Sequence, residues 1–135
     1  QRLRAIIKHN MVENHIIGFD FSGIVVESNS SSFQVGDAVF GTMPPSCGTL
    51  AEYVCAPLDQ VCHKPTSLSF AQAAALPLVG LTALQSLKPY IHSNSSILIL
   101  GASGGTGHVA VSVARVLGAQ HVCGVCSQRN FEFVQ

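Results

Sequence analysis

The hydrophobic pattern of the first half of the chain predicts short strands. Apolar segments rich in β-branched and aromatic residues alternate there with turns that contain Gly, Pro and Ser, which is typical of closely spaced strands. We expect strands within residues 16–27, 38–41, 49–56 and 60–63. Residues 3–7 fit either a short strand or a helical turn. Strands of this length and spacing indicate a small β-barrel.

A helical pattern replaces the strand pattern after residue 65. Ser69 and Gln72 have the spacing of a capping box, in which each side chain bonds the backbone N–H of the other residue. This pair predicts the start of a helix that runs through Ala75, and Pro77 is expected to end or kink it. A second helix is expected over residues 79–88, where leucines recur every three residues.

The last third of the chain predicts a strand, a glycine-rich turn, a helix and a second strand. Residues 97–100 are an unbroken apolar run, as expected of a strand covered on both faces in a parallel sheet. The turn at residues 101–107 precedes a helix with one apolar face (Val109, Val113, Val116 and Leu117). Gly118 stands where a left-handed residue ends the helix, and residues 121–126 form the second strand.

A turn of this kind is typical of dinucleotide-binding βαβ units. The helix N-terminus offers unpaired N–H groups and a partial positive charge to a phosphate. The usual G-x-G-x-x-G is present with alanine first, as Ala102-x-Gly104-x-x-Gly107. We therefore predict phosphate contacts from the turn residues Ser103, Gly104, Gly105, Thr106 and Gly107. The alternative, a glycine-rich turn without function, does not account for the complete strand–turn–helix–strand context.

The composition restricts the possible partners. Of the 135 residues, 47% are hydrophobic and only 10% are charged, so some apolar surface is expected to be covered by protein outside this chain. Seven Lys and Arg balance seven Asp and Glu, which gives no indication of nucleic acid binding. No apolar run reaches the roughly 20 residues of a membrane span. Five scattered cysteines and the absence of a signal peptide predict an intracellular location, in the cytoplasm or an organelle.

Several motifs in order resemble one protein family. They are GFDFSG at residues 18–23, VGDAV at 35–39, GTLAEY at 48–53, AAALP at 73–77, GLTA at 80–83 and the glycine turn. Together they resemble the zinc-independent quinone oxidoreductase and enoyl reductase branch of the medium-chain dehydrogenase/reductase superfamily. The resemblance covers nearly the whole chain, and an ordered set of motifs is more specific than any single one.

The resemblance implies an α/β chain built from parts of two domains. A partial GroES-like β-barrel, the substrate domain, is expected over residues 1–66, and the first βαβ unit of a Rossmann fold over residues 67–135. It also implies hydride transfer from NADPH to a quinone or an α,β-unsaturated carbonyl. Thr82 lies in the motif that flanks the nicotinamide in such enzymes, and a bond from its hydroxyl to the preceding helical turn is an equally good interpretation.

The residues argue against zinc and for NADPH. Phe19 occupies the position of a histidine ligand in zinc-dependent relatives, and the cysteines are too widely spaced for a structural zinc site, so no metal is expected. NAD enzymes usually place an acid at the end of the second strand for the ribose 2′-OH. Ser127, Gln128 and Arg129 stand there instead, and Ser127 and Arg129 are predicted to bind the 2′-phosphate of NADPH. A solvated Arg129 is the alternative.

Two other features have simple structural interpretations. Cys123 and Cys126 form a C-x-x-C, but residues three apart on a strand point to opposite faces, so a structural role is favoured over a redox role. His108 begins the phosphate helix, where a solvent-facing side chain is favoured over a phosphate contact.

The resemblance finally implies that both ends of the family's usual length are missing. The chain is therefore expected to be the middle of a longer enzyme, inactive as this fragment, or a truncated gene product that acts as a non-catalytic binding or structural subunit. A stable chain of this kind is expected to cover its unpaired strand edges and apolar faces with another copy, as a homo-oligomer.

Overall fold

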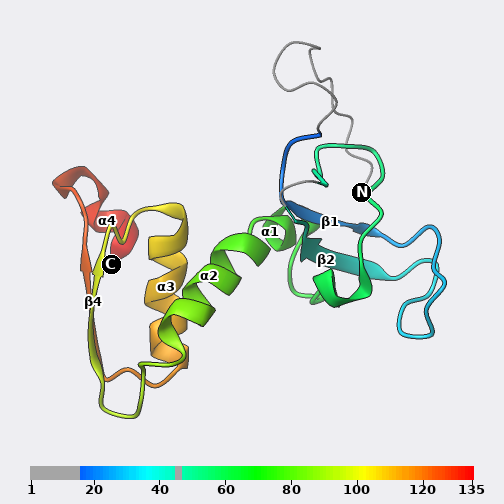
Figure 1. Cartoon of the computed structure of the whole chain (residues 1–135). Helices are drawn as coiled ribbons and strands as arrows, with labels where there is room; N and C mark the ends of the chain where they lie inside the picture. Colours follow the sequence, from blue (N-terminus) through cyan, green and yellow to red (C-terminus); the bar gives the residue numbers. More distant parts are fainter. Residues whose placement is uncertain (1–15, 45–46) are drawn as a thin grey trace. The chain divides into compact units, whose positions relative to one another are not determined.

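The computed structural model describes residues 16–44 and 47–135. The chain forms two compact units, divided between Leu78 and Val79, and each is described by itself (Figure 1). The domain boundary expected from the sequence, between residues 66 and 67, stays a prediction. The strand or helical turn expected at residues 3–7 lies outside the described residues.

The first unit contains an antiparallel sheet of three strands in the order β1-β2-β3. These are β1 (Asp20–Ile24), β2 (Ala38–Thr42) and β3 (Val61–His63). The 3₁₀ helix η1 (Leu58–Gln60) directly precedes β3. Phe21, Val39 and Met43 are the buried core of this unit. In the part of the chain that the structure describes, these strands form an open sheet and not a closed barrel.

One predicted strand is wrong. Residues 49–56 contain no strand, although their aromatic and β-branched residues favour one. The backbone N–H of Ala51 donates to the carbonyl of Thr49 at 2.8 Å, a tight turn that interrupts the extended run. Among the described residues no strand pairs with this segment, and an extended chain without a ladder partner is not a strand.

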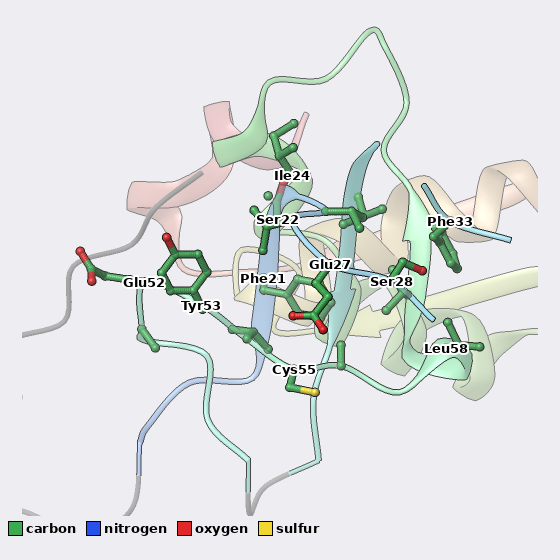
Figure 2. Close-up of a pocket in the computed structure, with 18 of the residues that line it drawn as sticks. Phe21, Ser22, Ile24, Glu27, Ser28, Phe33, Glu52, Tyr53, Cys55 and Leu58 are labelled. Carbon is green, nitrogen blue, oxygen red and sulfur yellow. The ribbon is translucent and has the colours of Figure 1, made fainter. Parts of the chain in front are cut away.

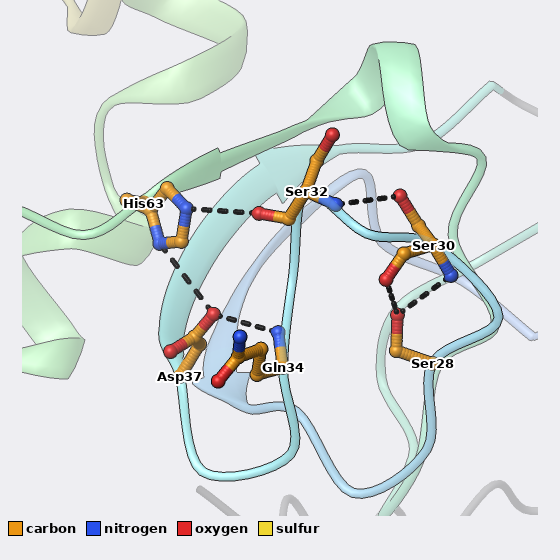
Figure 3. Close-up of polar contacts among 6 residues, drawn as sticks. All are labelled: Ser28, Ser30, Ser32, Gln34, Asp37 and His63. Atoms are coloured by element: carbon orange, nitrogen blue, oxygen red, sulfur yellow. Dashed lines mark hydrogen bonds and ion pairs between the residues drawn. The ribbon is translucent and has the colours of Figure 1, made fainter.

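Polar contacts hold the connection between β1 and β2 (Figure 3). The Asp37 carboxylate accepts the backbone N–H of Gln34 at 2.8 Å and lies 4.0 Å from Nδ1 of His63. On its other side, the His63 ring reaches the Ser32 carbonyl with 3.3 Å between Nε2 and the oxygen. Ser28 and Ser30 order the start of the same loop through hydroxyl–backbone bonds. The serine-rich loop is therefore tied to β3.

The capping box is confirmed at the start of α1 (Phe70–Ala74). The Ser69 hydroxyl accepts the N–H of Gln72 at 3.2 Å, and the Gln72 side chain accepts the N–H of Ser69 at 2.9 Å. Proline does not kink α1 but begins the next helix, α2 (Pro77–Leu87), two residues earlier than predicted. Proline suits a first helical position because its missing N–H would have no acceptor there. The Asp20 carboxylate accepts the backbone N–H of Leu78, in the first turn of α2, at 2.9 Å.

The second unit confirms the predicted strand–turn–helix–strand order. The strands β4 (Ser96–Leu100) and β5 (His121–Val125) are parallel, and Leu98 pairs with Cys123. The helix α3 (Gly105–Val116) crosses between them and packs on one face of this sheet (Figure 1). Gly118 ends α3 with φ +95°. The N–H groups of Gly118 and Ala119 bond the carbonyls of Arg115 and Ala114, which is a Schellman motif.

One prediction about burial in this unit is wrong, and another holds for three of its four residues. The apolar run 97–100 is covered on one face only, since Leu98 and Leu100 remain 60% and 73% exposed. The predicted apolar face of α3 is confirmed for Val109, Val113 and Leu117, which pack against the core. It is wrong for Val116, which is 87% exposed, and the fully packed positions are Ala110 and Ala114. The small alanine side chains let the helix backbone approach the sheet closely, and the half-buried valines flank that contact.

Candidate functional site

The glycine turn between β4 and α3 is tightly closed. Gly101 has φ +72°, a left-handed conformation that favours glycine. Its carbonyl accepts the N–H of Gly104 at 2.9 Å. Ala102 is fully buried, and its N–H donates to the Val125 carbonyl at 2.9 Å, which ties the turn to the end of β5. The backbone of the turn is therefore fixed at the carboxyl edge of the sheet.

The N-terminus of α3 leaves three N–H groups available for an anion. Gly104 is the N-cap residue and has no side chain to cap the helix. The first helical bond runs from the N–H of His108 to the Gly104 carbonyl, at 3.0 Å. The N–H groups of the preceding residues, Gly105, Thr106 and Gly107, have no acceptor within the helix. Together with the helix dipole they form an arrangement suited to a phosphate.

Gly107 and Gly105 have different roles in this turn. A Cβ on Gly107 would lie 2.9 Å from the Ala102 Cα and closer still to the Gly101 carbonyl oxygen. A Cβ on Gly105 would meet only the Val79 side chain, at 3.7 Å. Gly107 therefore permits the close contact of helix and strand, whereas Gly104 and Gly105 are exposed and leave the backbone accessible. The turn fits the pyrophosphate of a dinucleotide.

The structure brings the predicted serines together through a residue that sequence reasoning missed. The Asn130 Nδ2 donates to the Ser103 Oγ at 3.0 Å and to the Ser127 Oγ at 3.2 Å. Ser103 belongs to the glycine turn and Ser127 follows β5, so Asn130 links the two segments. Arg129 directly precedes Asn130 in the 3₁₀ helix η2 (Gln128–Asn130) and is exposed. Asn130 could have been found from its position three residues after Ser127, because this spacing allows a local hydrogen bond between the two side chains.

His108 is held by its own helix. Its Nδ1 lies 2.8 Å from the Gly104 carbonyl, and its ring packs against Phe133 of the helix α4 (Phe131–Val134) with 5.6 Å between centroids. The side chain is exposed, in agreement with the solvent-facing interpretation. Its bond to Gly104 makes it part of the support of the turn.

The remaining candidate residues are Thr82 and the two cysteines of the C-x-x-C. Thr82 is on the exposed side of α2, and its role stays a prediction. Cys123 is exposed on β5 and Cys126 lies beyond the end of the strand, and both thiols are free. Residues 16–44 and 47–135 contain no group of three or more His, Cys, Asp or Glu side chains that could hold a metal ion.

The first unit has an apolar hollow of its own (Figure 2). Its volume is about 780 Å³, and it lies between β1 and the segment from Ala51 to Leu58. The Phe21, Val54 and Val61 side chains line it. The Ser22 hydroxyl in its wall is buried and has no hydrogen-bond partner in the described structure. Glu27, Glu52, Tyr53 and Cys55 also line the hollow, and all four are exposed residues (Figure 2).

Fold and site together define a class of protein, in which a small β domain is followed by a βαβ unit of the kind typical of dinucleotide-binding folds. Residues 3–66 match the alcohol dehydrogenase GroES-like domain. The chain is 41% identical over 128 residues to the NAD(P)H oxidoreductase RTN4IP1, mitochondrial, of Homo sapiens. This match covers 88% of the chain and 32% of that protein. It is 38% identical to the 2-methylene-furan-3-one reductase of Solanum lycopersicum, over 87% of this chain and 33% of that protein.

A solved structure agrees with these relatives. The quinone oxidoreductase from Coxiella burnetii is similar with a TM-score of 0.76 and 41% identity, over 87% of this chain and 38% of that chain. The chain therefore belongs to the medium-chain dehydrogenase/reductase superfamily, as a partial member with the α/β fold class expected from its motifs. It spans about a third of the length of the curated relatives it matches. No helix within the described ranges is long and apolar enough to cross a membrane.

Proposed function

We propose that the chain is the phosphate-binding part of an NADPH-dependent oxidoreductase that reduces a quinone or an α,β-unsaturated carbonyl. The observation that carries this proposal is the set of free N–H groups at the start of α3, next to the linked serines Ser103 and Ser127. The relatives named as an NAD(P)H oxidoreductase, a furanone reductase and a quinone oxidoreductase support the reaction class. A relative named as mitochondrial supports an organelle as its location.

Each residue of the site has a binding or orienting task in this proposal. The N–H groups of Gly105, Thr106 and Gly107 donate to the pyrophosphate, and Ser127 and Arg129 donate to the ribose 2′-phosphate. Thr82 lies beside the nicotinamide. When bound, NADPH supplies the hydride, so the protein contributes mainly by orienting the two reactants.

The choice of NADPH predicts a selective effect of Arg129→Ala. The exposed guanidinium of Arg129 follows β5, where the 2′-phosphate is expected. Loss of a charge-assisted bond to that phosphate is expected to weaken NADPH binding by roughly tenfold or more and to leave NADH binding unchanged. Fluorescence titration with both nucleotides measures this. Arg115→Ala, at the far end of α3, is the matched control and is expected to change neither affinity.

Equal affinities of the wild type for NADPH and NADH, unaffected by Arg129→Ala, would contradict the proposed selectivity. Binding of neither nucleotide would contradict the proposed function itself.

We also propose that this chain by itself has no oxidoreductase turnover. It spans about a third of its relatives' length, and a dinucleotide contacts strands beyond the first βαβ unit. NADPH oxidation with quinones or enones, followed by absorbance, is expected to stay at the uncatalysed rate. Turnover by the purified chain above that rate would refute this expectation.

A non-catalytic subunit is the second candidate function. The observation that favours it is the bare face of the β4–β5 sheet, where Leu98 and Leu100 are exposed. Exposed apolar faces of this kind mark contacts with protein. In this alternative the chain associates with another copy and keeps the nucleotide turn only as structure.

A further inference from the structure

Asn130 joins the two segments that a dinucleotide would contact. Its side-chain amide donates one hydrogen bond to Ser103 in the glycine turn, 27 residues away in the sequence, and one to Ser127 just after β5. The backbone N–H of Asn130 also donates to the Ser127 carbonyl at 2.9 Å, which closes η2 and fixes the backbone of the asparagine. Asn130 is half-buried, so its amide group is held in place between the two serines.

The direction of these hydrogen bonds leaves both hydroxyl hydrogens available. A side-chain amide NH₂ has two donors, and in Asn130 one reaches each serine oxygen. A hydroxyl that accepts such a bond keeps its own O–H free to donate elsewhere. Within the described residues, neither hydroxyl donates to an acceptor of the protein. Asn130 therefore presents Ser103 and Ser127 as a pair of donors.

A phosphate is the ligand group that matches such a pair, because its ionised oxygens accept hydrogen bonds and donate none. A ribose hydroxyl, which both donates and accepts, has no comparable need for two oriented donors. The positive charge of Arg129 adjoins the pair in the sequence. The end of the second strand is also where dinucleotide folds distinguish a 2′-phosphate from a 2′-hydroxyl.

We propose that Asn130 is a positioning residue for nucleotide selectivity, which orients the hydroxyls of Ser103 and Ser127 as donors to the 2′-phosphate of NADPH. This inference rests on the proposed function and adds to it the residue that sets the direction of the bonds. Asn130 itself does not contact the nucleotide. It acts through the two serines.

The sharpest test is Asn130→Asp, which keeps the shape of the side chain but replaces the amide donors with a carboxylate that only accepts. The serine O–H groups then turn toward Asp, and the added negative charge repels a phosphate. NADPH affinity of the full chain is expected to fall by about thirtyfold and NADH affinity by less than about threefold. Asn130→Asp is expected to weaken the binding of adenosine 2′,5′-bisphosphate as much as that of NADPH. It is expected to change the binding of 5′-AMP as little as that of NADH.

Matched variants separate selectivity from folding. Asn94→Asp makes the same exchange at an exposed left-handed position before β4 and is expected to leave both affinities unchanged. If Asn130→Asp fails to fold, Ser103→Ala combined with Ser127→Ala removes the two hydroxyls and is expected to abolish the preference for NADPH. Equal losses for NADPH and NADH in these variants would overturn the inference and leave Asn130 a structural residue. A wild type that binds neither nucleotide would instead overturn the proposed function.

Discussion

Replacing Gly107 by alanine is expected to destabilise the Val79–Gln135 unit by about 3 kcal/mol and to abolish nucleotide binding. The added Cβ would lie 2.9 Å from the Ala102 Cα and would overlap the Gly101 carbonyl oxygen. Both partners are backbone atoms of the fixed turn, so neither can move aside without breaking the bond from Ala102 to Val125. The helix must then move away from the strand, and the three N–H groups at its start lose their position.

Two glycine variants are the controls for this prediction. Gly80→Ala makes the same exchange inside α2, where a Cβ would have nothing within 4 Å, and is expected to raise stability by up to about 1 kcal/mol. Gly105→Ala is expected to keep the fold and weaken binding, because its Cβ would reach only Val79 and would face the phosphate. Thermal unfolding and NADPH titration measure the effects. A Gly107→Ala protein as stable as Gly80→Ala would show that helix and strand are not in close contact.

Leu98→Lys is expected to convert a self-associated chain into a monomer. Leu98 is 60% exposed on the uncovered face of β4, beside Leu100 at 73% and opposite Cys123 and Val125 of β5. A second copy that covers this face would bury these side chains, at a gain of roughly 25 cal/mol per Å² of apolar surface. A lysine there would bring two like charges into the contact, and an increase of the dimer dissociation constant by about a hundredfold is expected. Sedimentation velocity measures it.

Val116→Lys provides the matched control for this prediction. Val116 is 87% exposed on α3, away from the bare sheet face, so the same change of charge is expected to leave association intact. A wild type that sediments as a monomer at micromolar concentration would contradict the proposed contact between copies. Equal dissociation of both lysine variants would show that association follows net charge and not this face.

The sequence predicted the local structure well where chemistry acts over a few residues. The capping box of Ser69 and Gln72 and the left-handed end of α3 at Gly118 both form as expected. Each depends on one or two residues whose backbone or side chain permits few alternatives. The glycine turn is similar, since its tight bend and its contact with the strand both require residues without a Cβ.

Predictions that depend on distant parts of the chain were less successful. Residues 49–56 have the composition of a strand but lack a ladder partner, and composition cannot supply one. The apolar spacing of α3 predicted three residues that do pack against the core, but it missed Ala110 and Ala114, which are the buried residues of the helix. Pattern analysis gives little weight to alanine, although a small side chain is what a close helix–sheet contact requires.

The site was predicted in its residue types but not in its connections. Ser103 and Ser127 were expected to bind different parts of a nucleotide, and nothing in their spacing indicates that Asn130 joins them. That link depends on the return of the chain from β5 to the glycine turn, which only the folded βαβ unit defines. The same return explains why Asn130, five residues beyond the end of β5, was not a candidate.

The central claim is that the start of α3 holds a nucleotide phosphate, and backbone amide NMR during titration with adenosine 2′,5′-bisphosphate tests it most directly. The amide signals of Gly105, Thr106 and Gly107 and the side-chain amide of Asn130 are expected to shift together and to saturate. Signals from β1, β2 and β3 are expected to stay in place. The absence of any shift at saturating ligand, or shifts confined to the first unit, would contradict the account.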